Sequence, residues 1–320
     1  MNAKELKIFL KSVTRLTPGQ KQALLAELKV AGQGDEVRAL VESRFNEMLA
    51  CPHCQSTRVV RNGSASGLQR YKCRACVVTF NALSTTPLAR LRMKAKWFAQ
   101  QDVLQQGLSV KQAAISLEVA RTTAFRWRHR FLQLTQAVKA QELAGVVEAD
   151  ETFFLRSNKG QPTGRKARKR GGRASRSGRG EDLVPVLVAR DRSGATADFL
   201  LEAVSKACLS QALAPRIHSD AVLCTDGSAA MAGAAQNMGL QHEPVNLSAG
   251  ERVRGPWHIQ NVNSYHGRLK QWMTRFKGVA TDRLENYLGW FRALDRATKH
   301  RRKSAPMLAL ALALGLEGHH

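Results

Sequence analysis

Four of the six cysteines form two pairs, Cys51 with Cys54 and Cys73 with Cys76. Two residues separate the members of each pair, and eighteen residues separate the pairs. This spacing is typical of a tetrahedral zinc site with four thiolate ligands, in which each pair forms a tight turn and a hairpin brings the pairs together. Because four cysteines leave no open coordination position, we expect structural Zn²⁺. A redox-active cysteine pair is the minor alternative.

Two aspartates, Asp150 and Asp226, interrupt apolar segments in the second half of the chain. We expect Asp150 in a strand over residues 145–154 and Asp226 at the end of a strand over residues 221–227. A carboxylate in an apolar strand is unfavourable unless it binds a cation or another partner. Two such carboxylates converging on Mg²⁺ or Mn²⁺ could support phosphoryl transfer. Taken singly, Asp226 could belong to a turn and Asp150 could be a capping acid.

Three other acids lie close to these aspartates in the sequence. Side chains alternate between the two faces of a strand, so Glu148 shares the face of Asp150 and is a reserve ligand. Glu151 points to the opposite face for the same reason. Asp220 precedes the strand that carries Asp226, and we expect no role for it at a metal site.

The composition favours a nucleic-acid partner. The chain has 320 residues, with 50 lysines and arginines against 25 acids, and a formal net charge of +25. This charge favours a polyanion, although a generally basic soluble protein would also show it. No apolar run reaches the roughly 18–20 residues of a membrane span, and charges interrupt every apolar run of the N-terminus, unlike a secretion signal. We expect a cytoplasmic protein that binds double-stranded DNA and no membrane.

The N-terminal region, residues 1–48, is typical of a small helical accessory region. A first amphipathic helix is followed by a second that begins at Pro18, with Thr17 as N-cap, and ends near Leu28. A third helix is expected over residues 36–48. Residues 49–86 would then form the zinc ribbon, in which apolar and basic residues alternate as ribbon strands require.

The segment from 87 to 140 indicates a helix-turn-helix. Residues 108–132 predict two short helices joined by a turn at residues 118–120, and Ser109 with Gln112 makes a capping box. Such a motif presents its second helix to the major groove of DNA, whereas a plain helical linker is the alternative. The inward residues of the second helix are Ala124, Trp127 and Phe131. The residues expected to face DNA are Arg121, Thr122, Thr123, Arg126, Arg128 and Arg130.

A basic insertion follows the strand that carries Asp150. Residues 156–180 contain ten lysines or arginines and no acid, and much of the rest is Gly, Ser and Pro. This composition predicts a flexible loop that contacts phosphates, although a solvated linker is the alternative. The candidate DNA contacts in the loop are Arg165, Lys166, Arg168, Lys169 and Arg170.

Strands and helices alternate through residues 141–300, which predicts a mixed α/β sheet. Residues 301–320 form a C-terminal tail. Besides the two strands that carry Asp150 and Asp226, the expected elements are strands at 183–194 and 195–201 and a helix at 202–212.

In their order and spacing, five blocks of this chain resemble the insertion-sequence transposases of the Merlin-related group. The blocks are CPHC with CRAC, VEADET, CTDG, HIQNVNSYHGRLK and LENYLGWFRALDR, and the resemblance covers about residues 48–296. It implies an N-terminal zinc ribbon and a ribonuclease H-like, retroviral-integrase-type catalytic domain. It also implies a DDE-type enzyme, active as a homo-oligomer on DNA. Such an enzyme binds terminal inverted repeats, cleaves the transposon ends with a divalent metal, and transfers the freed 3′-OH to target DNA.

The resemblance also bears on the third metal ligand. Many relatives have a glutamate seven residues before a lysine, and some have an asparagine; this chain has Asn263 before Lys270. Residues seven apart share one face of a helix. An amide oxygen can ligate Mg²⁺ but brings no charge, and Lys270 would face the DNA phosphates or the scissile end. His258 could orient water or DNA, or cap the helix, and Glu285 is the alternative third acid.

Two other classes of protein remain open on the sequence alone. One is a DNA-binding protein derived from a transposase but catalytically silent, which a departure at Asp150 or Asp226 would have favoured. The other is a structure-specific nuclease with the same ribonuclease H-like core. The N-terminal DNA-reading modules argue against that class, because such a nuclease reads shape more than sequence.

Overall fold

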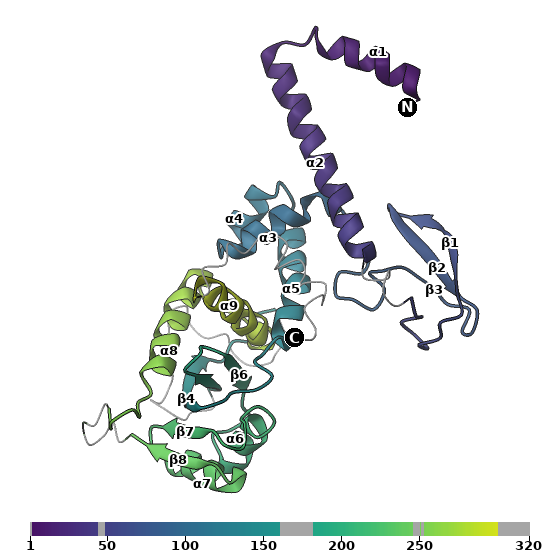
Figure 1. The fold of residues 1–320 in the computed structure, drawn as a ribbon. Coiled ribbons are helices and arrows are strands. Elements are labelled where there is room, and N and C mark those ends of the chain that lie inside the picture. Colours follow the sequence, from purple (N-terminus) through teal and green to yellow (C-terminus); the bar gives the residue numbers. More distant parts are fainter. Residues whose placement is uncertain (1, 44–48, 161–181, 246–249, 251–252, 300–320) are drawn as a thin grey trace. The chain divides into compact units, whose positions relative to one another are not determined.

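The computed structural model describes residues 2–43, 49–160, 182–245, 250 and 253–299. The described residues form two compact units, which are joined between Phe131 and Leu132 (Figure 1). None of the described helices is both long and apolar enough to cross a membrane.

The first unit begins with two helices, where the sequence predicts three. Helix α1 (Ala3–Val13) is followed by α2 (Pro18–Ser43), which begins behind the Thr17 cap as predicted. The expected break in α2 is wrong: the helix continues through Gly34, which approaches Ala95 so closely that an added Cβ would lie 3.4 Å from the Ala95 Cβ. Residues 44–48 of the expected third helix lie outside the described residues.

The zinc-ribbon segment folds as an antiparallel sheet in the order β1-β2-β3. Its strands are β1 (Val59–Ala65), β2 (Leu68–Cys73) and β3 (Thr79–Phe80). Cys51, Cys73 and Phe80 are buried at its centre, and Tyr71 stacks on Phe80. This confirms the predicted ribbon.

A cluster of short helices completes the first unit. The 3₁₀ helix η1 (Lys94–Lys96) leads into α3 (Trp97–Gln105), followed by α4 (Val110–Ser116) and α5 (Arg121–Ala137), which continues into the second unit. The predicted capping box of Ser109 and Gln112 is present. The turn between α4 and α5 contains Glu118 with a φ of 50°, so two helices joined by a turn lie where the sequence predicts them.

The second unit is built on a five-stranded sheet in the order β6-β5-β4-β7-β8. Strands β4, β5 and β6 pair antiparallel, whereas β7 and β8 run parallel to β4. This order is that of the ribonuclease H-like fold, as the sequence predicts. The strands are β4 (Val146–Leu155), β5 (Leu183–Asp191), β6 (Thr196–Leu200), β7 (Val222–Thr225) and β8 (Gln241–Pro244).

The two faces of β4 have different surroundings. Val147 and Ala149 are buried in a core that includes side chains of α6 (Lys206–Leu213) and α7 (Ala229–Met238). The alternate residues, Glu148 and Asp150, contact α8 (Gln260–Met273). This alternation is that of a strand covered on both faces.

The last helices pack on each other through aromatic side chains. The 3₁₀ helices η3 (Thr274–Phe276) and η4 (Thr281–Arg283) connect α8 to α9 (Leu284–Lys299). Trp272 of α8 lies edge-on to Trp290 of α9 at 4.9 Å between ring centroids, and Tyr265 lies 5.1 Å from Phe291. The block LENYLGWFR is therefore a packing helix, as predicted.

Candidate active site

Asp150 lies in β4, and Asp226 directly follows the adjacent parallel strand β7. The pairing of β4 with β7 ends at Glu148 opposite Cys224. Asp150 lies two residues beyond Glu148, and Asp226 lies two residues beyond Cys224, directly after β7. Because neighbouring strands lie about 4.8 Å apart, the two carboxylates share one edge of the sheet. This donor set fits a divalent cation such as Mg²⁺.

The turn that presents Asp226 has little freedom. Asp226 Oδ1 accepts a hydrogen bond from the Ser228 backbone N–H at 3.0 Å, and Ser228 caps α7. Gly227 has a φ of +79°, and an added Cβ would lie 3.1 Å from the Pro244 Cβ. A side chain at Gly227 would thus be strained by the backbone and by β8.

Helix α8 brings a third polar face to this edge. His266 is buried, and its Nδ1 lies 3.5 Å from Asp150 Oδ2. Asn263 precedes His266 by three residues and Lys270 follows it by four, so all three lie on one face of the helix. Asn263 and Lys270 are exposed. The predicted pair is therefore on the side of α8 that contacts Asp150.

His266 is not among the site residues that the sequence predicts. The sequence spacing could have indicated it, because His266 lies on the helical face that carries Asn263 and Lys270. His266 Nε2 is buried and has no hydrogen-bond partner among the described residues. The His266 ring is therefore placed to orient the Asp150 carboxylate through Nδ1.

The carboxylate of Glu148, the predicted reserve ligand, already contacts other groups of the protein. Its Oε2 accepts the backbone N–H groups of Asn261 and Val262 at 2.7 and 3.0 Å, and its Oε1 accepts from Asn261 Nδ2 at 2.7 Å. Arg192 Nη1 lies 3.0 Å from Oε1 and balances the charge of this fully buried carboxylate. Because the protein engages both oxygens of Glu148, these contacts favour a structural role over the predicted reserve role at the metal.

His258 belongs to the same cluster as Glu148. Its Nδ1 accepts from the backbone N–H of Gln260 at 3.3 Å and lies 3.3 Å from Glu148 Oε1. Arg192 contacts the His258 ring. Of the two roles expected for His258, these contacts favour capping the helix.

The other candidate acids lie in different surroundings. Glu285, in the first turn of α9, accepts a hydrogen bond from Gln136 Nε2. Asp220 is highly exposed and precedes β7, at the end of the strand opposite to Asp226. Glu151 follows Asp150 on β4 and so projects to the other face.

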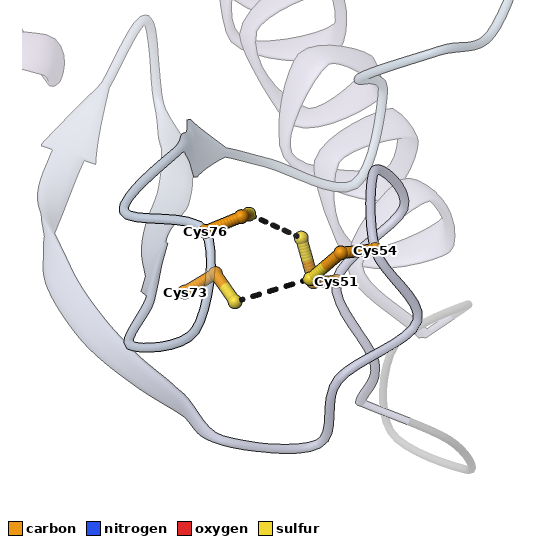
Figure 2. Close-up of side chains that lie close together, drawn as sticks. All are labelled: Cys51, Cys54, Cys73 and Cys76. Atoms are coloured by element: carbon orange, nitrogen blue, oxygen red, sulfur yellow. Dashed lines mark hydrogen bonds between the residues drawn. The ribbon is translucent and has the colours of Figure 1, made fainter.

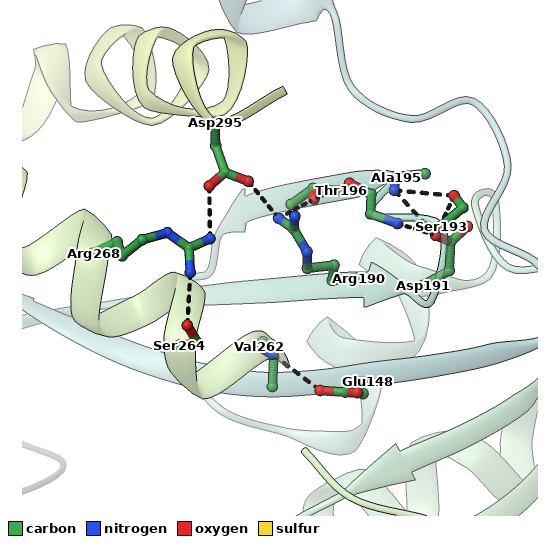
Figure 3. A network of polar contacts seen from close by, with 11 residues as sticks. Glu148, Arg190, Asp191, Ser193, Ala195, Thr196, Val262, Ser264, Arg268 and Asp295 are labelled. Carbon is green, nitrogen blue, oxygen red and sulfur yellow. Dashed lines mark hydrogen bonds and ion pairs between the residues drawn. The ribbon is translucent and has the colours of Figure 1, made fainter. Parts of the chain in front are cut away.

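A partly buried ionic network connects α8 with the sheet and α9. Asp295 of α9 accepts from Arg190 of β5 at 2.8 Å and from Arg268 of α8 at 2.6 Å (Figure 3). Arg190 is almost fully buried and also donates to Thr196. Arg268 donates to Ser264 within α8. The helix that carries Asn263 is thereby tied to two other elements.

Cysteine chemistry is not available beside Asp226. Cys224 is fully buried, and burial raises the pKa of its thiol to about 11. A thiol with this pKa is protonated at neutral pH and is a poor nucleophile. Cys224 therefore packs in the strand and takes no part in catalysis.

The four paired cysteines form a second site, in the first unit. Their sulfur atoms all lie within 4.8 Å of one another, and two cross-pair distances, Cys51 to Cys76 and Cys54 to Cys73, are 3.6 Å (Figure 2). Zn–S bonds of about 2.3 Å in a tetrahedron give sulfur separations of about 3.8 Å, so the cluster fits structural Zn²⁺.

The second helix of the helix-turn-helix exposes fewer residues than predicted. Ala124, Trp127 and Phe131 are buried as expected, and Arg121, Thr122 and Arg126 are exposed, while Thr123 is half-buried. The outward placement of Arg128 and Arg130 is wrong. Arg128 is 1% exposed and donates to the Leu108 carbonyl, and Arg130 donates to the carbonyls of Pro87 and Ala89. The segment before α3 and the start of α4 cover this side of α5.

The basic insertion is described only at its beginning. Lys159 Nζ donates to the carbonyls of Lys277 and Gly278, and Ser157 exchanges hydrogen bonds with Thr281. The candidate DNA contacts Arg165, Lys166, Arg168, Lys169 and Arg170 lie outside the described residues.

The sheet order defines a ribonuclease H-like domain, in which Asp150 and Asp226 are the candidate metal ligands. Residues 142–292 match the ISXO2-like transposase domain, and residues 48–77 match the InsA N-terminal domain, a zinc ribbon. The chain is 30% identical over 281 residues to the "Uncharacterized protein in transposable element ISH50" of Halobacterium salinarum, covering 86% of this chain and 95% of that protein. The chain belongs to this family of transposable-element proteins with an ISXO2-like DDE transposase domain.

Solved structures give only a distant likeness. A pre-cleavage Mos1 transpososome is 14% identical with a TM-score of 0.23, covering 70% of this chain and 79% of that one. The Mos1 strand transfer complex is 14% identical with a TM-score of 0.26, covering 70% and 78%. These scores are too low to carry an argument, and the fold assignment depends on the strand order.

Proposed function

We propose that this chain is the transposase of an insertion sequence in the Merlin-related group. It binds the terminal inverted repeats of its element, nicks the DNA at the 3′ ends, and joins those ends to target DNA. The proposal is supported by the match of residues 142–292 to a transposase domain, in which Asp150 lies in β4 and Asp226 directly follows the neighbouring parallel strand β7. The runner-up, a silent DNA-binding derivative, has no comparable observation in its favour.

In the proposed reaction, water attacks the phosphodiester at the transposon end and the 3′-oxygen leaves as a hydroxyl. That hydroxyl then attacks a target phosphodiester, and one target strand is the leaving group. Mg²⁺ or Mn²⁺ held by Asp150, Asp226 and Asn263 would activate the attacking oxygen and stabilise the leaving oxygen. His266 orients the Asp150 carboxylate, and Lys270 places a positive charge for the DNA phosphates.

DNA recognition is assigned to the first unit and the basic insertion. The exposed side of α5 combines Arg121, Thr122 and Arg126 with Phe125, whose ring is 47% exposed and rests edge-on against buried His129. Arginine reads guanine edges and apolar groups contact thymine methyls in the major groove. Two transposon ends require two such surfaces, so we infer a homo-oligomer on DNA.

The test is nicking of DNA that carries the element's own ends with their flanking genomic sequence. Wild type, Asp226→Ala and Asp220→Ala are compared in Mg²⁺ and in Mn²⁺. Asp220 is the matched control, because it lies at the other end of β7 and is exposed. We expect 3′-end nicking by wild type and Asp220→Ala, and a loss of at least about 100-fold in Asp226→Ala.

The products separate the alternatives. Joining of the nicked ends to a second DNA supports a transposase, whereas cleavage of branched DNA without end specificity would indicate a structure-specific nuclease. Specific binding of the ends by every variant, with cleavage by none, would overturn the proposal in favour of a silent DNA-binding protein.

A further inference from the structure

We propose that Glu148 is a positioning residue that caps α8 from the neighbouring strand and so holds Asn263 beside Asp150. This inference deepens the proposed function and rests on it for the role of Asn263. The capping contact itself is a property of the fold and can be tested without DNA or catalysis.

The first turn of α8 obtains most of its cap from another element. The helix begins at Gln260, whose N–H is accepted by His258 Nδ1 at 3.3 Å, and the preceding residue, Ile259, makes no side-chain hydrogen bond to the helix. The first N–H groups of any helix lack partners within the helix. Glu148 Oε2 accepts two of them, from Asn261 and Val262, at 2.7 and 3.0 Å (Figure 3 shows the contact to Val262). A strand carboxylate therefore replaces the usual N-cap side chain.

The cap is strong because it is charged and buried. Glu148 is fully buried, and a carboxylate at a helix N-terminus is stabilised by the positive end of the helix dipole. Asn261 Nδ2 adds a hydrogen bond to Oε1 at 2.7 Å, and Arg192 lies 3.0 Å from the same oxygen. Charge-assisted hydrogen bonds of this kind are shorter and stronger than neutral ones. The N-terminus of α8 is thereby fixed to β4.

The position of this cap links two candidate metal ligands. Glu148 and Asp150 are two residues apart on the same face of β4, and Asn261 and Asn263 are two residues apart at the start of α8. The strand that carries the first ligand therefore holds the helix that carries the third. A second contact, His266 to Asp150, lies one turn further along α8. A shift of α8 along β4 would break both contacts.

The central variant is Glu148→Gln, which keeps the shape but removes the charge and replaces one acceptor oxygen with an amide donor. Its matched control is Glu202→Gln, an exposed acid in the same unit. In zinc-loaded protein without DNA, we expect amide exchange at Asn261 and Val262 to accelerate by at least about 10-fold. Exchange in β4 and β5 should remain at the wild-type rate, which distinguishes removal of the cap from general unfolding.

The metal readout tests whether Glu148 acts through Asn263. Mn²⁺ is titrated into zinc-loaded protein, and free Mn²⁺ is followed by electron paramagnetic resonance. We expect Glu148→Gln and Asn263→Ala each to weaken Mn²⁺ binding by about 5- to 10-fold, and the double variant to be no weaker than either single one. The Mg²⁺ concentration for half-maximal nicking should move in parallel, while Glu202→Gln matches wild type.

Additive effects of the two substitutions would overturn the positioning role, as would unchanged exchange at Asn261 and Val262. If Glu148→Gln does not fold, Asn261→Ala gives the same test more mildly, since it removes only the side-chain donor to Oε1. It should weaken Mn²⁺ binding by about 2- to 3-fold, and wild-type binding would contradict the proposal. A protein that shows the exchange effect but nicks no DNA would leave the cap standing and refute the proposed function instead.

Discussion

At the scale of single residues, the proposed metal site has an amide, Asn263, where many relatives of the resembling family have a third carboxylate. Asn263 is exposed on the face of α8 that contacts Asp150 through His266. Two carboxylates and one amide give a cation less charge compensation than three carboxylates. The site should therefore require a higher metal concentration than a site with three acids.

Replacement of Asn263 by aspartate tests this reasoning directly. We expect Asn263→Asp to retain or raise metal-dependent nicking and to lower the half-maximal Mg²⁺ concentration by about 3- to 10-fold, because the added charge strengthens cation binding. The measurement is an Mg²⁺ titration of the nicking rate. Asn261→Asp is not a suitable control, because the Asn261 side chain donates a hydrogen bond to Glu148. Complete loss of nicking would mean that the Asn263 amide donates a hydrogen bond that a carboxylate cannot.

At the scale of elements, α9 is attached to the sheet through a buried ion pair. Arg292 pairs with Asp198 of β6, and both side chains are less than 10% exposed. The same guanidinium donates to the carbonyls of Thr135 and Val138 at 2.8 and 2.9 Å. One side chain thus joins β6 and α9 to the end of α5.

Removal of this guanidinium should destabilise the second unit. We expect Arg292→Met to lower the free energy of unfolding by about 3–5 kcal/mol, because it leaves the Asp198 carboxylate buried without a partner. Denaturant unfolding of the full chain measures the change, and Arg296→Met, on an exposed position of the same helix, is the control. Adding Asp198→Asn to Arg292→Met should recover part of the stability, and no recovery would contradict the role of the uncompensated charge.

Local patterns in the sequence predicted the elements but not every partner. The cysteine spacing, the apolar strands around Asp150 and Asp226, and the Ser109 capping box each depend on neighbours in the chain, and the structure has all of them. The hydrogen bonds that the Glu148 carboxylate accepts come from α8, more than 110 residues away in the sequence. The burial of Arg128 depends on a carbonyl 20 residues away. The periodicity of the sequence predicts which face of a helix or strand a residue lies on, but it does not predict which other element packs against that face.

At the scale of the whole molecule, the two compact units should respond separately to removal of zinc. We expect chelation to unfold the ribbon, since β1–β3 enclose a small core around Cys51, Cys73 and Phe80. The sheet of the second unit contains none of these cysteines and should keep its wild-type unfolding transition. Hydrogen exchange of ribbon and sheet peptides with and without chelator measures this, and Cys73→Ser should reproduce the effect. Joint unfolding of both units would contradict it.

The net charge of +25 predicts DNA binding that weakens steeply with salt, because each neutralised phosphate releases condensed counterions. If the basic insertion, residues 156–180, binds phosphates, its deletion should flatten the slope of log K against log salt by about 0.9 for every phosphate that the insertion neutralises. A matched variant that replaces its ten lysines and arginines with glutamine keeps the loop length. It should flatten the slope as the deletion does, whereas a slope equal to that of wild type in both variants would remove the insertion from the DNA interface. Flattening by the deletion alone would assign the effect to the length of the loop, and the charge that binds phosphates would then reside on the ribbon and α5.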